Sequence, residues 1–263
     1  MPGLIRDLFE SVRNPAIKRV FFPSLRSNRR ILFWYASKVV LPGSRIEPVE
    51  RLHHLNELRR KGEALTFICN HLTYADSHII ETLFIRFGCA DLARHIIHIA
   101  GQKTYELLRR PFTRSLNTIR VYQPKAKIDK HHKRKMNSRA LKWAAHLKRR
   151  GYCLLLFPEG TRTRRHKRFN PHAANPKSTI YFRHSRVVPL ALMGAENIMP
   201  VGKILQRSAT VSLKIGEPID HDELEALLRL KYPQIHDHEL RQRLMSHYMQ
   251  RIQELLAPEY QPV

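Results

Sequence analysis

His71 and Asp76, five positions apart, are the two side chains of this 263-residue chain whose types and spacing best suit catalysis. Histidine is the side chain whose pKa matches general-base work near neutral pH. A carboxylate at Asp76 would fix one imidazole nitrogen and leave the other free to take a proton from a hydroxyl group. The sequence shows no obvious internal nucleophile beside the pair, so the substrate's hydroxyl would attack directly and no covalent enzyme intermediate is required.

A second segment, residues 157–162, reads Phe-Pro-Glu-Gly-Thr-Arg. An arginine guanidinium binds two phosphate oxygens at once, and Gly160 would let the backbone approach the same group. Arg162 and Arg164 are therefore candidate phosphate ligands, whereas the charges at residues 165–168 are interpreted as a solvated run. Together the two segments predict transfer of a group to a hydroxyl on a phosphorylated molecule.

Both segments follow short apolar runs, residues 64–69 and 152–157, that are predicted to be buried strands. In α/β folds, functional side chains gather where strands end. Thr73 and Asp76 have the spacing that opens a helix, which would place Asp76 in the first helical turn. With His71 still in the preceding loop, the carboxylate could then reach back to the imidazole.

The rest of the chain alternates predicted helices with predicted strands. Helices are expected over residues 52–60, 76–87, 133–150 and near the C-terminus, and strands over residues 96–100, 119–122, 187–192 and 210–215. The helix over residues 133–150 has one apolar and one strongly basic face, and it ends at Gly151. The alternation predicts one α/β domain over residues 46–263, with a mixed central sheet covered by helices.

Residues 1–45 differ from the remainder of the chain, because basic residues there accompany Leu, Phe, Trp and Tyr. This composition is typical of an amphipathic helical segment in a membrane interface, and packing of the same helices on the domain is the alternative. No run of about 20 apolar residues is present, so we expect no bilayer span. With no secretory signal visible, the expected location is cytoplasmic, peripherally associated with the inner face of a membrane.

The chain carries 47 Lys and Arg against 22 Asp and Glu, a formal net charge of +25. Such a charge attracts anionic partners: nucleic acid, acidic lipid headgroups or an acidic carrier protein. The basic residues are spread over many segments without a recognition motif for nucleic acid, which is therefore not expected as a partner. The three cysteines lie in apolar settings, and we expect neither disulfides nor a metal site.

The two segments belong to a set of four blocks, and with them the sequence resembles the glycerolipid acyltransferase superfamily. The resemblance covers roughly residues 60–220. Its blocks, in order, are residues 70–76, residues 101–122 with Arg120, residues 157–162 and residues 187–191. The superfamily includes the glycerol-3-phosphate and the 1-acylglycerol-3-phosphate acyltransferases.

Several details are similar to the soluble, plastid-type glycerol-3-phosphate acyltransferases. They are residues 70–76, 111–112, 121–122 and 133–139. Ala126 stands where that subfamily has a phosphate-binding histidine, and Glu159 and Thr161 agree instead with the lysophosphatidate branch. The sequence thus leaves the acceptor open between the two branches.

The resemblance implies an O-acyltransferase of phospholipid biosynthesis that uses no cofactor. It would move a fatty acyl group from a thioester of coenzyme A or acyl carrier protein to a hydroxyl of glycerol-3-phosphate or 1-acylglycerol-3-phosphate. His71 would be the general base, and Asp76 would hold it. The acceptor would be bound by Arg120, Lys125, Lys127, Glu159, Gly160, Thr161, Arg162 and Arg164. The alternatives are a catalytically silent membrane-binding scaffold and a basic nucleic-acid-binding protein.

Overall fold

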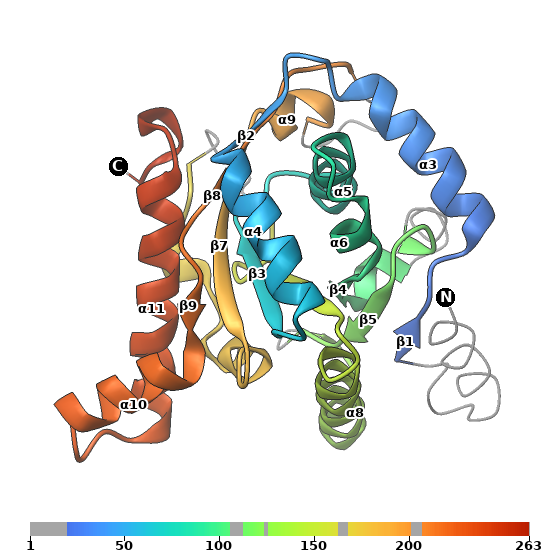
Figure 1. The fold of residues 1–263 in the computed structure, drawn as a ribbon. Coiled ribbons are helices and arrows are strands. Elements are labelled where there is room, and N and C mark those ends of the chain that lie inside the picture. The colour runs from blue at the N-terminus through green and yellow to red at the C-terminus, as the bar shows by residue number, and fades with distance from the viewer. Residues whose placement is uncertain (1–19, 106–112, 124–125, 163–167, 201–206, 263) are drawn as a thin grey trace.

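A computed structural model of the chain describes residues 20–105, 113–123, 126–162, 168–200 and 207–262. At its centre lies a sheet with the strand order β1-β5-β4-β6-β3-β7-β8-β2, and β9 pairs additionally with β7 (Figure 1). The strands are β1 (Phe21–Phe22), β2 (Arg45–Glu47), β3 (Leu65–Cys69), β4 (Ile96–Gly101), β5 (Thr118–Val121), β6 (Cys153–Leu156), β7 (Arg186–Met193), β8 (Ser212–Ile215) and β9 (Ile219–Asp220). Helices surround the sheet, so the predicted mixed α/β fold is confirmed.

The five central strands β5, β4, β6, β3 and β7 run parallel to one another. The pairs β1–β5, β7–β8 and β7–β9 are antiparallel, which makes the sheet mixed. Every residue of β3 and of β6 is buried. Continuous apolar runs of this kind are typical of parallel strands that are covered on both faces.

The helices fall into two groups. Near one another lie α3 (Arg26–Val39), α4 (Val49–Arg60), α5 (Asp76–Arg86) and α6 (Ala90–Arg94). A second group contains α8 (Lys130–Lys148), α11 (Asp237–Leu255) and the short 3₁₀ helix η3 (Pro176–Tyr181), and Figure 1 shows α8 and α11 apart from the first group. The remaining described helices are α9 (Ala195–Ile198), α10 (His221–Lys231) and the 3₁₀ helices η1 (Gln102–Tyr105), η2 (Pro171–Ala173) and η4 (Pro258–Tyr260).

Helix α8 illustrates how the apolar pattern dictates an element. Met136, Ala140, Ala144 and Leu147 recur at helical spacing and are buried. Asp129 precedes the helix and accepts a hydrogen bond from the backbone N–H of His132, so the helix begins three residues before the predicted start. The chain leaves the helix at Gly151, whose φ of +78° lies in the left-handed region that glycine adopts without strain.

The N-terminal part of the described chain is tied to the sheet and to α5. β1 pairs with β5 at one edge, and β2 pairs with β8 at the other. Between them α3 packs on α5, and Nη2 of Arg29 lies 2.5 Å from Oε2 of the fully buried Glu81. The other carboxylate oxygen of Glu81 bonds to Nε2 of His98 at 2.7 Å. The helix expected within residues 1–19 lies outside the described residues.

Helix α3 also has an exposed side. Ile31 and Trp34 each keep 64% of their surface accessible. Arg26, Arg30 and Lys38 are exposed on the same helix. Among the described residues, no helix is both long and apolar enough to cross a bilayer.

Candidate active site

The imidazole of His71 is held by a buried carboxylate. Nδ1 of His71 lies 2.8 Å from Oδ2 of Asp76, whose side chain is fully buried. The same carboxylate accepts bonds from the backbone N–H groups of Leu72 and Thr73 and from the Thr73 hydroxyl, at 2.7–3.0 Å. An ionised carboxylate only accepts, so the proton on Nδ1 points at Asp76 and the lone pair of Nε2 is available to take a proton.

The loop that carries His71 is fixed at both ends. Asn70, directly after β3, bonds through its amide to both backbone groups of Leu192 on β7, at 2.7 and 2.8 Å. At the other end, the Thr73 hydroxyl accepts a bond from the N–H of Ala75, just before α5 begins at Asp76. Because both ends are bonded, the position of the imidazole is set before any substrate arrives.

The second segment meets the first because β3 and β6 are neighbours in the sheet. Oε1 of Glu159, a side chain only 6% exposed, accepts a bond of 2.8 Å from the backbone N–H of His71. The ring of Phe157 stacks on the imidazole of His71, with centroids 4.4 Å apart and planes inclined by 24°. Glu159 and Phe157 therefore determine where the backbone and the ring of His71 lie.

The turn after Glu159 carries the candidate phosphate ligands. Gly160 has a φ of +65°, and its carbonyl oxygen accepts a bond of 2.6 Å from the side chain of Gln123. The guanidinium carbon of Arg162 lies 3.7 Å from the centre of the Tyr74 ring, so Arg162 is stacked on the loop that carries His71. Thr161 is exposed.

The remaining predicted phosphate ligands do not lie in the turn that follows Glu159, or lie outside the described residues. Arg120 lies on β5, and β4 separates β5 from β6, the strand that leads to the turn with Arg162. The guanidinium of Arg120 lies 5.6–5.7 Å from the ring centres of Phe22, Tyr105 and Tyr122. Lys127 is exposed, and Lys125 and Arg164 lie outside the described residues.

Tyr74, Gln123 and Phe157 were not predicted as site residues. Phe157 and Tyr74 lie inside the two segments that were singled out, but their roles depend on contacts between segments. Asn70 was part of the first segment, and its link to Leu192 depends on the parallel pairing of β3 with β7. No spacing along the chain signals such contacts, because Gln123 and Gly160 are 37 positions apart and Asn70 and Leu192 are 122 positions apart.

The described residues include no group of three or more His, Cys, Asp and Glu side chains that could hold a metal ion. Cys69, Cys89 and Cys153 are free and buried, and burial raises the pKa of the Cys153 thiol to about 12. A buried thiol of that pKa supplies no thiolate nucleophile near neutral pH.

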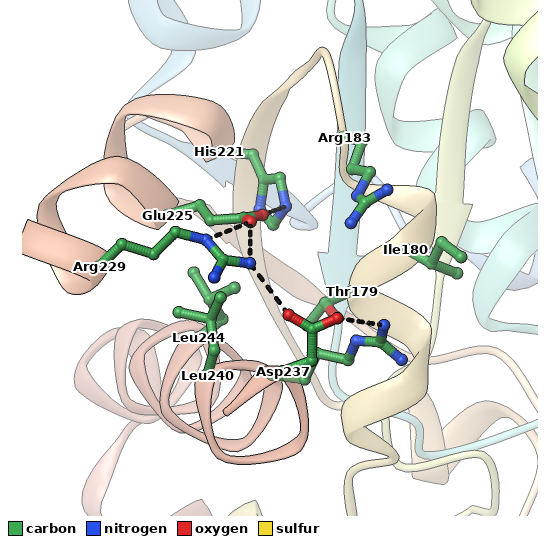
Figure 2. A pocket seen from close by; sticks show the side chains of 10 residues that line it. Thr179, Ile180, Arg183, His221, Glu225, Arg229, Asp237, Leu240 and Leu244 are labelled. Carbon is green, nitrogen blue, oxygen red and sulfur yellow. Dashed lines mark hydrogen bonds and ion pairs between the residues drawn. The ribbon is translucent and has the colours of Figure 1, made fainter. Parts of the chain in front are cut away.

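A small cavity lies elsewhere, between η3, α10 and α11 (Figure 2). The residues that line it include Arg183, His221, Glu225, Arg229 and Asp237, and Arg229 forms ion pairs with both Glu225 and Asp237. Burial lowers the pKa of His221, whose Nδ1 bonds to the Tyr248 hydroxyl at 2.9 Å. None of the predicted site residues that the structure describes lines this cavity, so it is separate from the site at His71.

Comparison with known proteins gives a family match and matches to solved structures. The model of the acyltransferase family matches residues 50–201. The crystal structure of the 1-acyl-sn-glycerophosphate acyltransferase PlsC from Thermotoga maritima is similar at 19% sequence identity and a TM-score of 0.49. That match covers 87% of this chain and 82% of PlsC. No curated protein sequence matches.

Proposed function

Because the chain belongs to the acyltransferase family, we propose that it transfers a fatty acyl group from an acyl thioester to a hydroxyl of a glycerol phosphate. The acceptor is glycerol-3-phosphate or 1-acylglycerol-3-phosphate, and the donor is a thioester of coenzyme A or of acyl carrier protein. The observation that supports this most directly is the bond between Nδ1 of His71 and Oδ2 of Asp76, which leaves Nε2 as a base.

In this proposal the chemistry proceeds in two steps around one imidazole. Nε2 of His71 takes the proton of the acceptor hydroxyl as its oxygen attacks the thioester carbonyl. When the carbon–sulfur bond breaks, the thiolate leaves and receives that proton from Nε2. The Asp76 carboxylate stabilises the imidazolium between the two steps and keeps the ring in orientation.

The acceptor phosphate would be bound by Arg162 and by residues near it in the same turn. Arg162 presents two N–H donors to phosphate oxygens from its stack on Tyr74, which restricts its movement. Gly160 and Thr161 belong to the same turn, and Arg164 follows two positions after Arg162 in the sequence. Arg120 and the lysines at positions 125 and 127 would complete a positively charged binding site. Glu159 positions the His71 loop, since it bonds the backbone of that loop.

We place the protein at a membrane surface, where its product belongs. The exposed Ile31 and Trp34 of α3, with Arg26, Arg30 and Lys38 beside them, combine the apolar and cationic side chains of an interfacial helix. The cytoplasmic face of a membrane carries anionic lipid, which attracts a chain of +25 formal charge.

The test is release of free thiol by purified protein, with each donor offered to each acceptor. We expect turnover that requires an acceptor, that favours one donor–acceptor combination, and that His71→Ala abolishes. His54→Ala is the matched control, because His54 is an exposed histidine on α4. Absence of turnover with all four combinations would overturn the proposed function.

A further inference from the structure

Helix α8 carries a charge of one sign along its whole length. Residues 130–150 include nine Lys and Arg and no Asp or Glu. Lys135, Lys142 and Arg149 are exposed and follow one another at intervals of seven residues. At 1.5 Å per residue they form a line of about 21 Å along one side of the helix, and we call this line the α8 basic face. Within the described part of the chain these three side chains have no acidic partner.

The α8 basic face differs from the exposed side of α3. The exposed large apolar side chains of the described residues include Ile31 and Trp34 on α3, and none lies on α8. An interfacial helix gains its affinity for lipid from apolar side chains inserted below the headgroups, in addition to its charges. The α8 basic face lacks that component and is suited to a hydrophilic anionic partner.

The first half of α8 lies next to the candidate active site. The side chain of Asn137 bonds to both backbone groups of Tyr122, at 2.8 and 2.9 Å, and the ring of His132 lies 6.0 Å from the Tyr122 ring. The next residue, Gln123, bonds to the carbonyl of Gly160 in the turn that carries Arg162. A partner bound along α8 would therefore have one end beside the turn that holds the acceptor.

We propose that the α8 basic face is the docking surface for acyl carrier protein, as the donor in the reaction proposed above, on which this inference rests. A line of cations about 21 Å long matches acidic side chains distributed along a helix of a protein partner. The phosphates of coenzyme A are concentrated on one nucleotide and could engage only a part of that line. Opposite charges would also steer the carrier protein toward the edge of the sheet where His71 lies.

The experiment compares two triple variants of equal charge. In the test variant, Lys135→Glu, Lys142→Glu and Arg149→Glu reverse the α8 basic face. In the control variant, Lys61→Glu, Lys177→Glu and Lys231→Glu change the net charge equally at exposed positions on other elements. Binding of unacylated carrier protein is measured by calorimetry, and KM is measured for acyl carrier protein and for acyl-CoA. Circular dichroism and thermal unfolding verify that both variants are folded.

We expect the test variant to bind carrier protein at least about tenfold more weakly and to show a raised KM for acyl carrier protein alone. The control variant should retain wild-type affinity. An equal loss in both variants, unchanged affinity in the test variant, or no binding by the wild type would overturn the proposal. The proposal would also be overturned if the test variant no longer bound anionic vesicles but still bound the carrier protein with wild-type affinity. Turnover with acyl-CoA reports separately on the proposed function, so the two proposals can fail independently.

Discussion

The backbone N–H of His71 donates a hydrogen bond of 2.8 Å to Oε1 of Glu159, although 88 positions separate the two residues. The bond exists because β3 and β6 are adjacent and parallel, so the segments that follow them start at the same edge of the sheet. Glu159 therefore holds the backbone of His71, the proposed base, in addition to lying in the turn that carries Arg162.

Replacing Glu159 should therefore affect the base more than the acceptor. Glu159→Ala leaves the N–H of His71 without its acceptor, so we expect a loss of about 1–3 kcal/mol in the free energy of unfolding. We also expect a lower kcat with a nearly unchanged acceptor KM. Glu159→Gln keeps an oxygen that can accept the bond from the His71 N–H, so it should retain most of the stability and most of kcat. Denaturant unfolding and steady-state kinetics measure these effects, and a rise in acceptor KM alone would show that Glu159 contacts the acceptor instead.

Asp76→Asn tests the orientation of the imidazole. An amide can donate to Nδ1, which would move the ring proton to Nε2 and remove the base, so we expect kcat to fall by about 10²–10⁴. The matched control is Asp222→Asn, since Asp222 lies an equally short 2.8 Å from Nδ1 of the exposed His184. Single-turnover rates are measured for both variants, and we expect a large fall in Asp76→Asn but not in Asp222→Asn. Equal rates in Asp76→Asn and wild type would exclude Asp76 as the partner of the base.

The stack of Arg162 on Tyr74 predicts a graded effect on acceptor binding. Arg162→Ala should raise the acceptor KM and leave kcat less affected, if the arginine binds ground state and transition state alike. Tyr74→Ala removes a cation–π contact of about 0.5–1 kcal/mol and should raise the same KM about two- to fivefold. Tyr74→Phe keeps the ring and should behave like wild type. Identical effects of Tyr74→Ala and Tyr74→Phe would assign the effect to the hydroxyl rather than to the stack.

The sequence predicts the central strands well and the sheet edges poorly, for a physical reason. β3, β6 and β7 are continuous apolar runs bounded by polar residues, so their burial is visible in composition alone. β1, β2 and β9 are two or three residues long and owe their conformation to the strands beside them.

In the candidate site, too, the local contacts could be predicted from the sequence and the contacts between distant segments could not. The pairing of His71 with Asp76 is local and could be predicted from spacing and helix-start chemistry. The contacts made by Glu159, Phe157 and Gln123 depend on strand order, which one sequence does not reveal. Where Arg120 lies relative to Arg162 depends on strand order in the same way.

The buried ion pair between α3 and α5 predicts a large loss of stability. Among the described residues, Arg29→Ala would leave the fully buried carboxylate of Glu81 with His98 as its remaining side-chain partner, and breaking such a pair costs about 3 kcal/mol or more. The control is Arg186→Ala, because Arg186 and Glu63 form a pair that is exposed on both sides and should contribute at most about 1 kcal/mol. Urea unfolding measures the loss in the free energy of unfolding for each variant. Equal losses in the two variants would show that the Arg29–Glu81 pair is effectively solvated.

Lys148 predicts a pH dependence of stability. Burial lowers the pKa of Lys148 from 10.5 to about 8, and its ammonium donates to the carbonyl oxygens of Tyr181 and Arg183. Between these two pH values the unfolded chain binds more protons than the folded chain, so the free energy of unfolding should rise with pH. Lys148→Met has no ammonium group to titrate, so the wild type should gain stability relative to the variant as the pH rises from about 8 to about 10.5. Parallel curves for the two proteins would contradict the lowered pKa.

The strands at the two edges of the sheet, β1 and β2, have a consequence for how the chain folds during synthesis. Their partners β5 and β8 lie far downstream, and Ser212, which pairs with Arg45, is translated 167 positions later. At about 5–20 residues per second, the ribosome takes roughly 8 s or more to cover that interval. Until then the nascent chain carries α3, with Ile31 and Trp34, without a partner for β2 on its C-terminal side, although β1 on its N-terminal side can pair once β5 is made. A membrane surface or a chaperone that covers this helix during that interval would protect the growing chain from aggregation.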